Sequence, residues 1–85
     1  MDAKTLHVLG PGCARCKMLA ENARAAAREL GIPFELFEVT DIEEILKFDV
    51  LMTPALVVDG EVRLVGKVLS KDEIKPLLGD ERVGG

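Results

Sequence analysis

The sequence predicts an α/β sandwich, and two observations support that fold class. Short apolar or β-branched runs alternate with helical stretches along the chain, in the order β-α-β-α-β-β-α. A helix of about 17 residues separates the first two strands, and this length suits a right-handed crossover between parallel strands. Because the chain has 85 residues, we expect one domain over residues 1–85, with a modest core.

The first strand and the first helix follow from clear local signals. Residues 5–9, TLHVL, form an apolar run that GPG closes, which predicts a buried strand and a tight turn. Residues 14–30 are rich in good helix formers, and Gly31 and Pro33 end that helix. The helical stripe expected to face the core consists of Cys16, Leu19, Ala23, Ala26 and Leu30.

The middle of the chain supplies the remaining strands and a short helix. Asp41 suits the N-cap of that helix, and Asp59 with Gly60 suits a two-residue type I′ turn between the last two strands. The strand before this turn is apolar throughout, so it should be buried on both faces. The predicted elements are a strand at 33–39, a helix at 41–48, and strands at 55–59 and 61–65.

The last element is predicted to be a helix that begins with a capping box. Ser70 and Glu73 have the required spacing, so each should bond the backbone N–H of the other. Pro76 removes a hydrogen bond within the helix, which predicts a kink or an early end. We expect residues 79–85, GDERVGG, to form a flexible tail.

Composition and charge exclude several classes of function. The net charge of −4 argues against nucleic acid as a partner, because phosphate binding depends on clustered Lys and Arg. No apolar run approaches the roughly 20 residues that span a bilayer, so we expect no insertion into a membrane. No basic, apolar leader precedes the first strand, and we expect the cytoplasm, where a cysteine pair is more often catalytic or metal-binding than structural. Large apolar residues expected in or near the core are Met18, Leu19, Leu46, Leu51 and Met52. Met52, beside Thr53, is also a candidate to line a substrate groove.

Cys13 and Cys16 lie three positions apart where the first strand passes into the first helix. A disulfide closing so short a ring would add only about 2 kcal/mol of stability, which makes a purely structural role unconvincing. Cys13 should lie at the positive end of the helix beside Arg15 and Lys17, which lowers the pKa of its thiol. Cys16, on the apolar stripe, should keep a raised pKa. This contrast predicts that Cys13 attacks a disulfide and that Cys16 resolves the mixed disulfide.

Two other interpretations of the cysteine pair remain open. C-x-x-C is half of many tetrahedral metal sites, but the sequence has no third cysteine and only one histidine, His7. Two thiolates alone can hold a soft ion such as Cu(I), so a soft-metal or metalloid carrier is one alternative. The other alternative is a non-catalytic adaptor that acts by binding a partner.

Taken together, the stretches GPGCARCKMLAENARAAARELG and MTPALVVDGEVRLVGKVLSKDEI resemble the thioredoxin and glutaredoxin superfamily. The likeness is greatest to its small redox-active disulfide proteins of archaea and bacteria. It implies a thioredoxin-like three-layer sandwich with a four-stranded mixed sheet in the order 2-1-3-4, and a cis peptide bond before Pro54. From the residues alone, the Thr53–Pro54 bond could equally be trans, the commoner case before proline. It also implies a site at which a substrate segment pairs with the backbone of Thr53. Substrate-binding residues implied by the resemblance are Gly12, Ala14, Arg15, Thr53 and Pro54.

The resemblance further implies a thiol–disulfide oxidoreductase of the thioredoxin or glutaredoxin type. Its redox group is the Cys13–Cys16 disulfide, with no further cofactor and no metal. The implied partners are substrate proteins with disulfides and a disulfide reductase as electron donor, and we expect a monomer. The chain departs from thioredoxins in having Gly12 before the first cysteine, where they have Trp, and no carboxylate in the first strand under Cys16. His7 is a candidate base for Cys16, but ordinary packing within the strand is the simpler interpretation.

Overall fold

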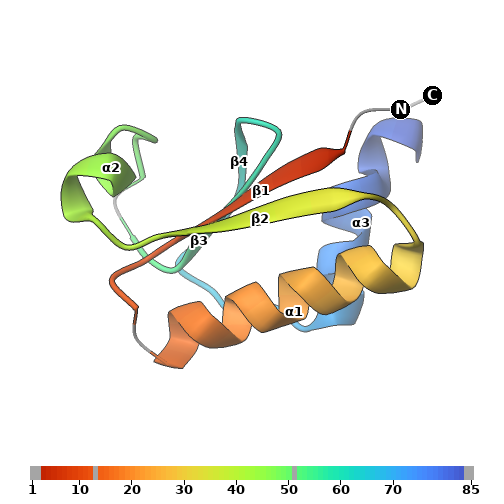
Figure 1. The fold of residues 1–85 in the computed structure, drawn as a ribbon, viewed down its shortest axis with the longest axis horizontal. Helices are drawn as coiled ribbons and strands as arrows, with labels where there is room; N and C mark the ends of the chain where they lie inside the picture. Colours follow the sequence, from red (N-terminus) through yellow and green to blue (C-terminus); the bar gives the residue numbers. More distant parts are fainter. Residues whose placement is uncertain (1–2, 13, 51, 84–85) are drawn as a thin grey trace.

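The computed structural model describes residues 3–12, 14–50 and 52–83, including side chains up to residue 78 (Figure 1). Strands and helices follow one another in the order that the sequence predicts. The first helix begins and ends at the predicted residues. The bounds of the other elements differ from the predicted ones by a few residues at most, except for the last helix. The elements are β1 (Lys4–Leu9), α1 (Ala14–Leu30), β2 (Phe34–Val39), α2 (Ile42–Leu46), β3 (Ala55–Val58), β4 (Glu61–Val65) and α3 (Lys71–Val83).

The four strands form one mixed sheet in the order β2-β1-β3-β4. β1 and β2 are parallel, whereas β3 is antiparallel to both β1 and β4. The sheet order and the mixed pairing confirm the fold that the resemblance implied. Because Leu9 at the end of β1 pairs with Ala55 at the start of β3, the residues that follow β1 lie next to those that precede β3.

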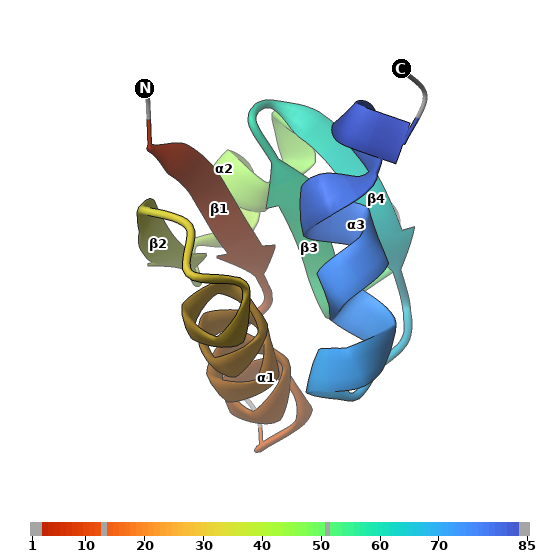
Figure 2. The ribbon, with the colours of Figure 1, turned by 90° about the vertical axis from the view of Figure 1, so that its right-hand side faces the viewer.

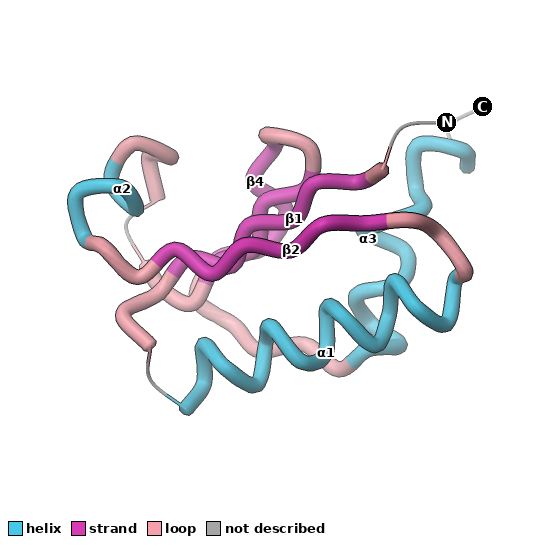
Figure 3. The backbone as a smooth tube through the Cα atoms, in the orientation of Figure 1, coloured by secondary structure: helices cyan, strands magenta, loops and turns pink. Residues whose placement is uncertain are grey.

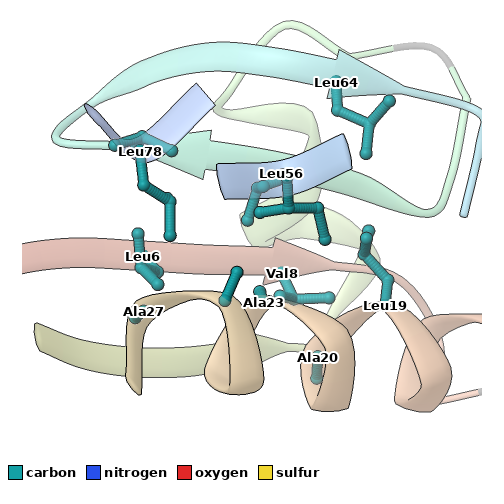
Figure 4. Packing of buried hydrophobic residues seen from close by; sticks show 12 residues of the cluster. Leu6, Val8, Leu19, Ala20, Ala23, Ala27, Leu56, Leu64 and Leu78 are labelled. Carbon is teal, nitrogen blue, oxygen red and sulfur yellow. The ribbon is translucent and has the colours of Figure 1, made fainter. Parts of the chain in front are cut away.

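Helices cover both faces of the sheet. α1 and α3 lie side by side on one face, and α2 lies on the other (Figure 2). The larger core cluster fills the space between the sheet and the α1–α3 layer, where aliphatic side chains of β1 and β3 pack against small residues of α1 (Figure 4). The smaller cluster, beneath α2, consists of Leu9, Ile45, Val50, Ala55 and Val57. None of the helices in the described ranges is long and apolar enough to cross a membrane.

Polar contacts fix the ends of the short elements as predicted. The carboxylate of Asp41 accepts a hydrogen bond from the backbone N–H of Glu43 at 2.9 Å and so caps α2. Asp59 and Gly60 have φ angles of 52° and 84°, and a type I′ turn requires positive φ at both positions. The backbone N–H of Ser70 donates to the carboxylate of Glu73 at 2.9 Å, which confirms the capping box of α3.

Asp59 also holds the beginning of β1. Its carboxylate accepts a hydrogen bond from the backbone N–H of Thr5 at 2.9 Å and forms an ion pair with Lys4 at 3.2 Å. The hydrogen bond from Thr5, together with Lys4, lowers the pKa of Asp59 below its usual value of 3.8. The charged form of this carboxylate therefore stabilises the pairing of β1 with the β3–β4 turn.

Glu29, near the end of α1, joins the two helices of the larger layer. Its carboxylate forms ion pairs with Lys71 and with Lys75, the latter at 2.6 Å. Hydrogen bonds from these two lysines lower the pKa of Glu29 to about 2. The side-chain amide of Asn22, in the middle of α1, donates to the carbonyl of Leu69, just before α3, at 2.9 Å. The second half of α1 is thus tied to the start of α3.

The last helix is longer than the sequence predicted. α3 continues through Pro76 to Val83, so the helix does not end early, whereas a kink at Pro76 and the flexibility of residues 79–85 stay predictions. Ile74 and Leu78, four residues apart on either side of the proline, are both fully buried against the sheet. Burying two such side chains contributes about 1.5–3 kcal/mol each, which together equals or exceeds the roughly 3 kcal/mol that a proline costs inside a helix.

Some large apolar residues that were expected in the core are exposed instead. Met18, Leu46 and Met52 have 56%, 57% and 60% of their surface exposed. Met18 directly precedes the buried Leu19 in α1, and successive helical residues point in different directions, so Met18 faces away from the core. On α2, Ile45 is the residue that points inward, which leaves its neighbour Leu46 exposed. Leu30, expected on the buried stripe of α1, is 37% exposed at the end of that helix. Leu51 lies outside the described residues.

Candidate functional site

Several connecting segments meet at one end of the sheet, where β1, β2 and β4 end and β3 begins (Figure 3). They are the segment after β1, the segment before β3 and the residue after β4. α1 begins directly beyond the first of them. The sheet order alone brings these segments together. Parallel neighbours such as β1 and β2 end on the same side of the sheet, and an antiparallel neighbour such as β3 begins on the side where β1 ends.

Cys16 lies in the first turns of α1 and is 4% exposed, as its place on the apolar stripe predicted. Its sulfur packs directly against Gly10, which follows β1. A Cβ added to Gly10 would lie 2.0 Å from the Cys16 Sγ and 3.1 Å from its Cβ. Only a residue without a side chain leaves room for this sulfur. Gly10 is itself held in place, since its N–H donates to the carbonyl of Val39 at 2.9 Å.

Thr53 and Pro54 form the adjacent wall of the site. The peptide bond between them is cis, as the resemblance implied. Pro54 is buried, Thr53 is partly exposed, and the Thr53 Cβ lies 3.8 Å from the position that a Cβ on Gly10 would take. The carbonyl of Pro54 accepts a hydrogen bond from the N–H of Gly66 at 2.8 Å. These contacts place Thr53 and Pro54 beside the seat of Cys16.

Gly66, the residue after β4, connects this wall to α1. Its carbonyl accepts a hydrogen bond from the Arg15 guanidinium at 3.4 Å. Gly66 has a φ of 75°, and a Cβ added there would lie 3.1 Å from the Cε of Met52. Met52 thus lies over the glycine, with most of its surface exposed. Arg15 and Met52 border the same side of the site.

Gly12 lies on the opposite side, toward α2. Its φ of 93° is the left-handed conformation that favours glycine. A Cβ added to Gly12 would lie 4.0 Å from the Cγ2 of Thr40, which joins β2 to α2. Ala14 is exposed at the first position of α1. The loop before α1 is therefore bordered by the start of α2.

The structure brings together most of the residues predicted for the site. Gly10 and Gly66 are surrounded by Cys16, Arg15, Thr53 and Pro54. Gly12 lies on the adjoining loop, and Ala14 lies at the start of α1. Cys13 lies outside the described residues, so the predicted attacking cysteine is not placed. Gly10 and Gly66 were not among the residues predicted for the site. The signal was a glycine at the end of each adjoining strand, which marks a close approach of the backbone.

His7 packs away from the cysteine site. Its ring stacks on Phe37, with ring centroids 5.4 Å apart, and is tilted against Phe48 at 5.3 Å. Phe48 belongs to the cluster under α2, whereas α1, which carries Cys16, covers the other face. The geometry therefore supports packing within the strand as the role of His7. Among the described side chains, no group of three or more His, Cys, Asp or Glu could hold a metal ion.

Comparison with known proteins decides the family. A family model described as a thioredoxin domain matches residues 4–79, nearly the whole chain. The chain belongs to the thioredoxin-domain family. It is 44% identical over 73 residues to a protein named thioredoxin from Methanothermobacter thermautotrophicus, covering 86% of this chain and 95% of that relative. It is 39% identical over 70 residues to a thioredoxin from Methanocaldococcus jannaschii, covering 82% and 80% of the two chains. This thioredoxin-domain protein is, in general class, a thiol–disulfide oxidoreductase.

Proposed function

We propose that this thioredoxin-domain protein reduces and re-forms disulfides of other proteins through a Cys13–Cys16 dithiol. The thiolate of Cys13 attacks one sulfur of the substrate disulfide and releases the other sulfur as a thiolate, which leaves a mixed disulfide. The Cys16 thiol then loses its proton and attacks the Cys13 sulfur. The Cys13–Cys16 disulfide forms, the second substrate sulfur leaves as a thiolate, and two electrons have passed to the substrate.

The observation that supports this proposal best is the seat of Cys16. Its sulfur is buried against Gly10, where it is protected from solvent oxidants and from alkylation. A resolving cysteine should be unreactive until a mixed disulfide forms next to it. The first turn of α1 holds Arg15 and Lys17 and no acid. Two cations therefore follow Cys13 within four positions of the sequence. Such surroundings favour a thiolate over a thiol at Cys13.

Substrate recognition is proposed to use the exposed rim of the site. Thr53 lies two residues before β3, beside the seat of Cys16, and is partly exposed, which supports pairing of its backbone with an extended segment. Gly12, Ala14 and Arg15, on the loop before α1 and at the start of α1, are proposed to complete the substrate-binding surface. Recognition would depend mainly on backbone contacts, which suits a protein that acts on several substrates. Pro54 supports this rim from below.

The partners and the compartment are parts of the same proposal. Re-reduction of the Cys13–Cys16 disulfide requires an electron donor, and we propose a disulfide reductase in that role. No separate cofactor is needed, because both electrons reside on the two sulfurs. We expect the protein to act as a monomer in the cytoplasm, where a reducing pool keeps exposed cysteine pairs in the dithiol form.

Matched cysteine variants test the assignment of the two roles. Reduced parent protein, Cys13→Ser and Cys16→Ser are each mixed with insulin, and the products are analysed by mass spectrometry under acid quench. Cys16→Ser should accumulate a stable mixed disulfide with insulin, because attack occurs and resolution does not. Cys13→Ser should form none. Mixed disulfide on Cys16 in the Cys13→Ser variant would reverse the assignment.

A second measurement tests the activation of Cys13. The rate of alkylation by iodoacetamide is followed against pH for the Cys16→Ser variant, so that only one thiol reacts. A Cys13 pKa of about 8.5 or higher, that of an unperturbed thiol, would contradict the proposal. Turnover of insulin that survives in Cys13→Ser would favour a different chemistry. Stoichiometric binding of Cu(I) without turnover would favour the metal carrier.

A further inference from the structure

A pair of apolar side chains protrudes from α2. Ile42 and Leu46 are each 57% exposed and lie four residues apart, so they share one face of the helix. Ile45, by contrast, is buried beneath the helix and anchors it to the sheet. We call the exposed pair Ile42 and Leu46 the α2 ridge. Neither side chain contributes to the cluster under α2, so their exposure is not a by-product of packing there.

Acidic side chains flank the α2 ridge. Asp41, Glu43, Glu44 and Asp49 are all exposed within this segment. The only cation between residues 41 and 49 is Lys47, and its ammonium is engaged by Glu44 at 3.1 Å. The α2 ridge is thus an apolar contact surface with a negative rim.

We propose that the α2 ridge is a docking surface for a redox partner protein whose own contact surface is apolar with a rim of Lys and Arg side chains. The complementary charges would guide the encounter, and burial of the two apolar side chains would hold it. This inference rests on the proposed function in one respect only, namely that the partner exchanges disulfides with this chain. It adds a surface outside the substrate-binding rim described above.

The position of the ridge suits such a partner. Thr40 lies two residues before α2, and its Cγ2 lies 4.0 Å from the position that a Cβ on Gly12 would take. A protein seated on the α2 ridge would therefore extend over the loop that leads into the cysteine motif. Docking and disulfide exchange can then occur in one encounter, without rearrangement of the fold.

The size and charge of the ridge indicate a transient partner and disfavour a second copy of this chain. Stable interfaces bury about 1,200–2,000 Å² in total, whereas redox encounters are smaller. Two side chains on a five-residue helix can form only the centre of a small interface. In a symmetric dimer through α2, the acidic rims of both copies would face each other, and like charges repel.

A titration that does not depend on redox chemistry tests the docking surface. The probe is a cysteine-free amphipathic peptide of Leu and Lys, added to the Cys13→Ser/Cys16→Ser protein while amide NMR spectra are recorded. The control peptide carries Glu in place of every Lys. We expect the Lys peptide to shift the amides of residues 41–47, and the Glu peptide to leave them unchanged. Raising the salt from about 0.01 M to about 0.15 M, where the Debye length falls from about 30 to about 8 Å, should weaken binding severalfold.

Matched variants separate the ridge from exposed apolar surface elsewhere. Ile42→Ser/Leu46→Ser should weaken binding of the Lys peptide about tenfold. The control is Leu30→Ser/Val62→Ser, which removes two exposed apolar side chains of α1 and β4 and should leave the affinity within twofold of the parent. Equal shifts with both peptides, shifts centred away from α2, or an unchanged affinity in Ile42→Ser/Leu46→Ser would each overturn the proposal.

The proposed function is assessed separately, in protein with both cysteines. Reduction of hydroxyethyl disulfide, a neutral small molecule, should proceed at the parent rate in Ile42→Ser/Leu46→Ser, because the ridge does not contact the cysteine site. Failure of the parent itself to reduce this compound would contradict the proposed function and would leave the result of the peptide titration standing. A rate that falls in the ridge variant alone would show that the ridge supports the cysteine site, and would overturn its role as a separate docking surface.

Discussion

Substitution of Gly10 by alanine tests the seat of Cys16 most directly. The new Cβ would lie 2.0 Å from the Cys16 Sγ and 3.1 Å from the Cys16 Cβ. Carbon atoms in contact prefer separations of about 3.5–4.0 Å, so the sulfur would have to move by about 1.5 Å or more. Rotating the Cys16 side chain relieves the first contact and leaves the second. The φ of Gly10 is not among the positive values, so alanine adds a steric cost without a backbone cost.

The size of that cost follows from over-packing a buried site. Inserting a methyl group into a well-packed core typically costs about 1–3 kcal/mol, and the overlap at Gly10 predicts the upper part of this range. A domain of this size has about 5–15 kcal/mol of stability in total, so Gly10→Ala should still fold. In the Cys16→Ala background the sulfur is gone and only the 3.1 Å contact remains. The cost of Gly10→Ala should then fall by about 1–2 kcal/mol, which is the coupling energy of the pair.

The assay is a double-mutant cycle in urea, followed by far-ultraviolet circular dichroism because the chain has no Trp and no Tyr. All four proteins are kept fully reduced, so that no disulfide contributes. A control cycle pairs Gly10→Ala with Ile74→Val in α3, where we expect additive effects because the two residues belong to different parts of the molecule. Two results would refute the reasoning: a Gly10→Ala protein as stable as the parent, or a cost that Cys16→Ala leaves unchanged.

Three further changes probe the polar and backbone features of the fold, each measured by urea unfolding. Asp59→Asn should lower the free energy of unfolding by about 0.5–1 kcal/mol at neutral pH; the value is small because the side chain is half exposed. The difference between variant and parent should vanish as the pH falls through the lowered pKa of Asp59, because the parent carboxyl then also loses its charge. In the parent, the ion pairs of Glu29 stabilise the fold above about pH 4.5, and this stabilisation is lost as the pH falls toward about 2. The stability of Glu29→Gln should therefore vary less with pH across that interval. An identical pH profile for variant and parent would show that the ion pairs with α3 contribute nothing. Asp49 has a φ of 61°, a left-handed conformation that glycine adopts readily and valine does not. Asp49→Gly should therefore be neutral or stabilising by up to about 1 kcal/mol, whereas Asp49→Val should destabilise by about 1–2 kcal/mol. The reverse order of stabilities would contradict backbone strain at this position.

The sequence predicted the elements well where a local signal determines the structure. Asp41, the Asp59–Gly60 turn and the Ser70–Glu73 box all act through bonds between near neighbours in the chain, so their effects can be inferred without knowing the fold. Pro76 shows the limit of such inference. Its local penalty was correctly identified, but the burial of Ile74 and Leu78 against a distant part of the chain outweighs it.

The site was predicted less completely because its contacts join segments far apart in the sequence. The cysteine spacing identified Cys16 and its burial, and the resemblance supplied Thr53 and Pro54. The fit of the Cys16 sulfur against Gly10 depends on the angle at which α1 leaves the sheet, which no local pattern encodes. The exposure of Met52 likewise depends on Gly66, whose bare backbone lets the methionine lie across the end of β4. Apolar residue type alone therefore placed Met52 wrongly in the core.

Two helices begin at the same end of the sheet, and their first turns carry opposite charges. α2 follows the usual preference, with Glu43 and Glu44 in its first turn, where acids near the positive end of a helix each contribute about 0.3–1 kcal/mol. α1 has no acid there and carries Arg15 and Lys17 instead, so it forgoes that stabilisation. A length of 17 residues and a buried stripe let α1 do without it, whereas the five-residue α2 depends on its caps. The positive end of α1 is therefore not offset by any acid of its first turn, whereas Glu43 and Glu44 offset the positive end of α2.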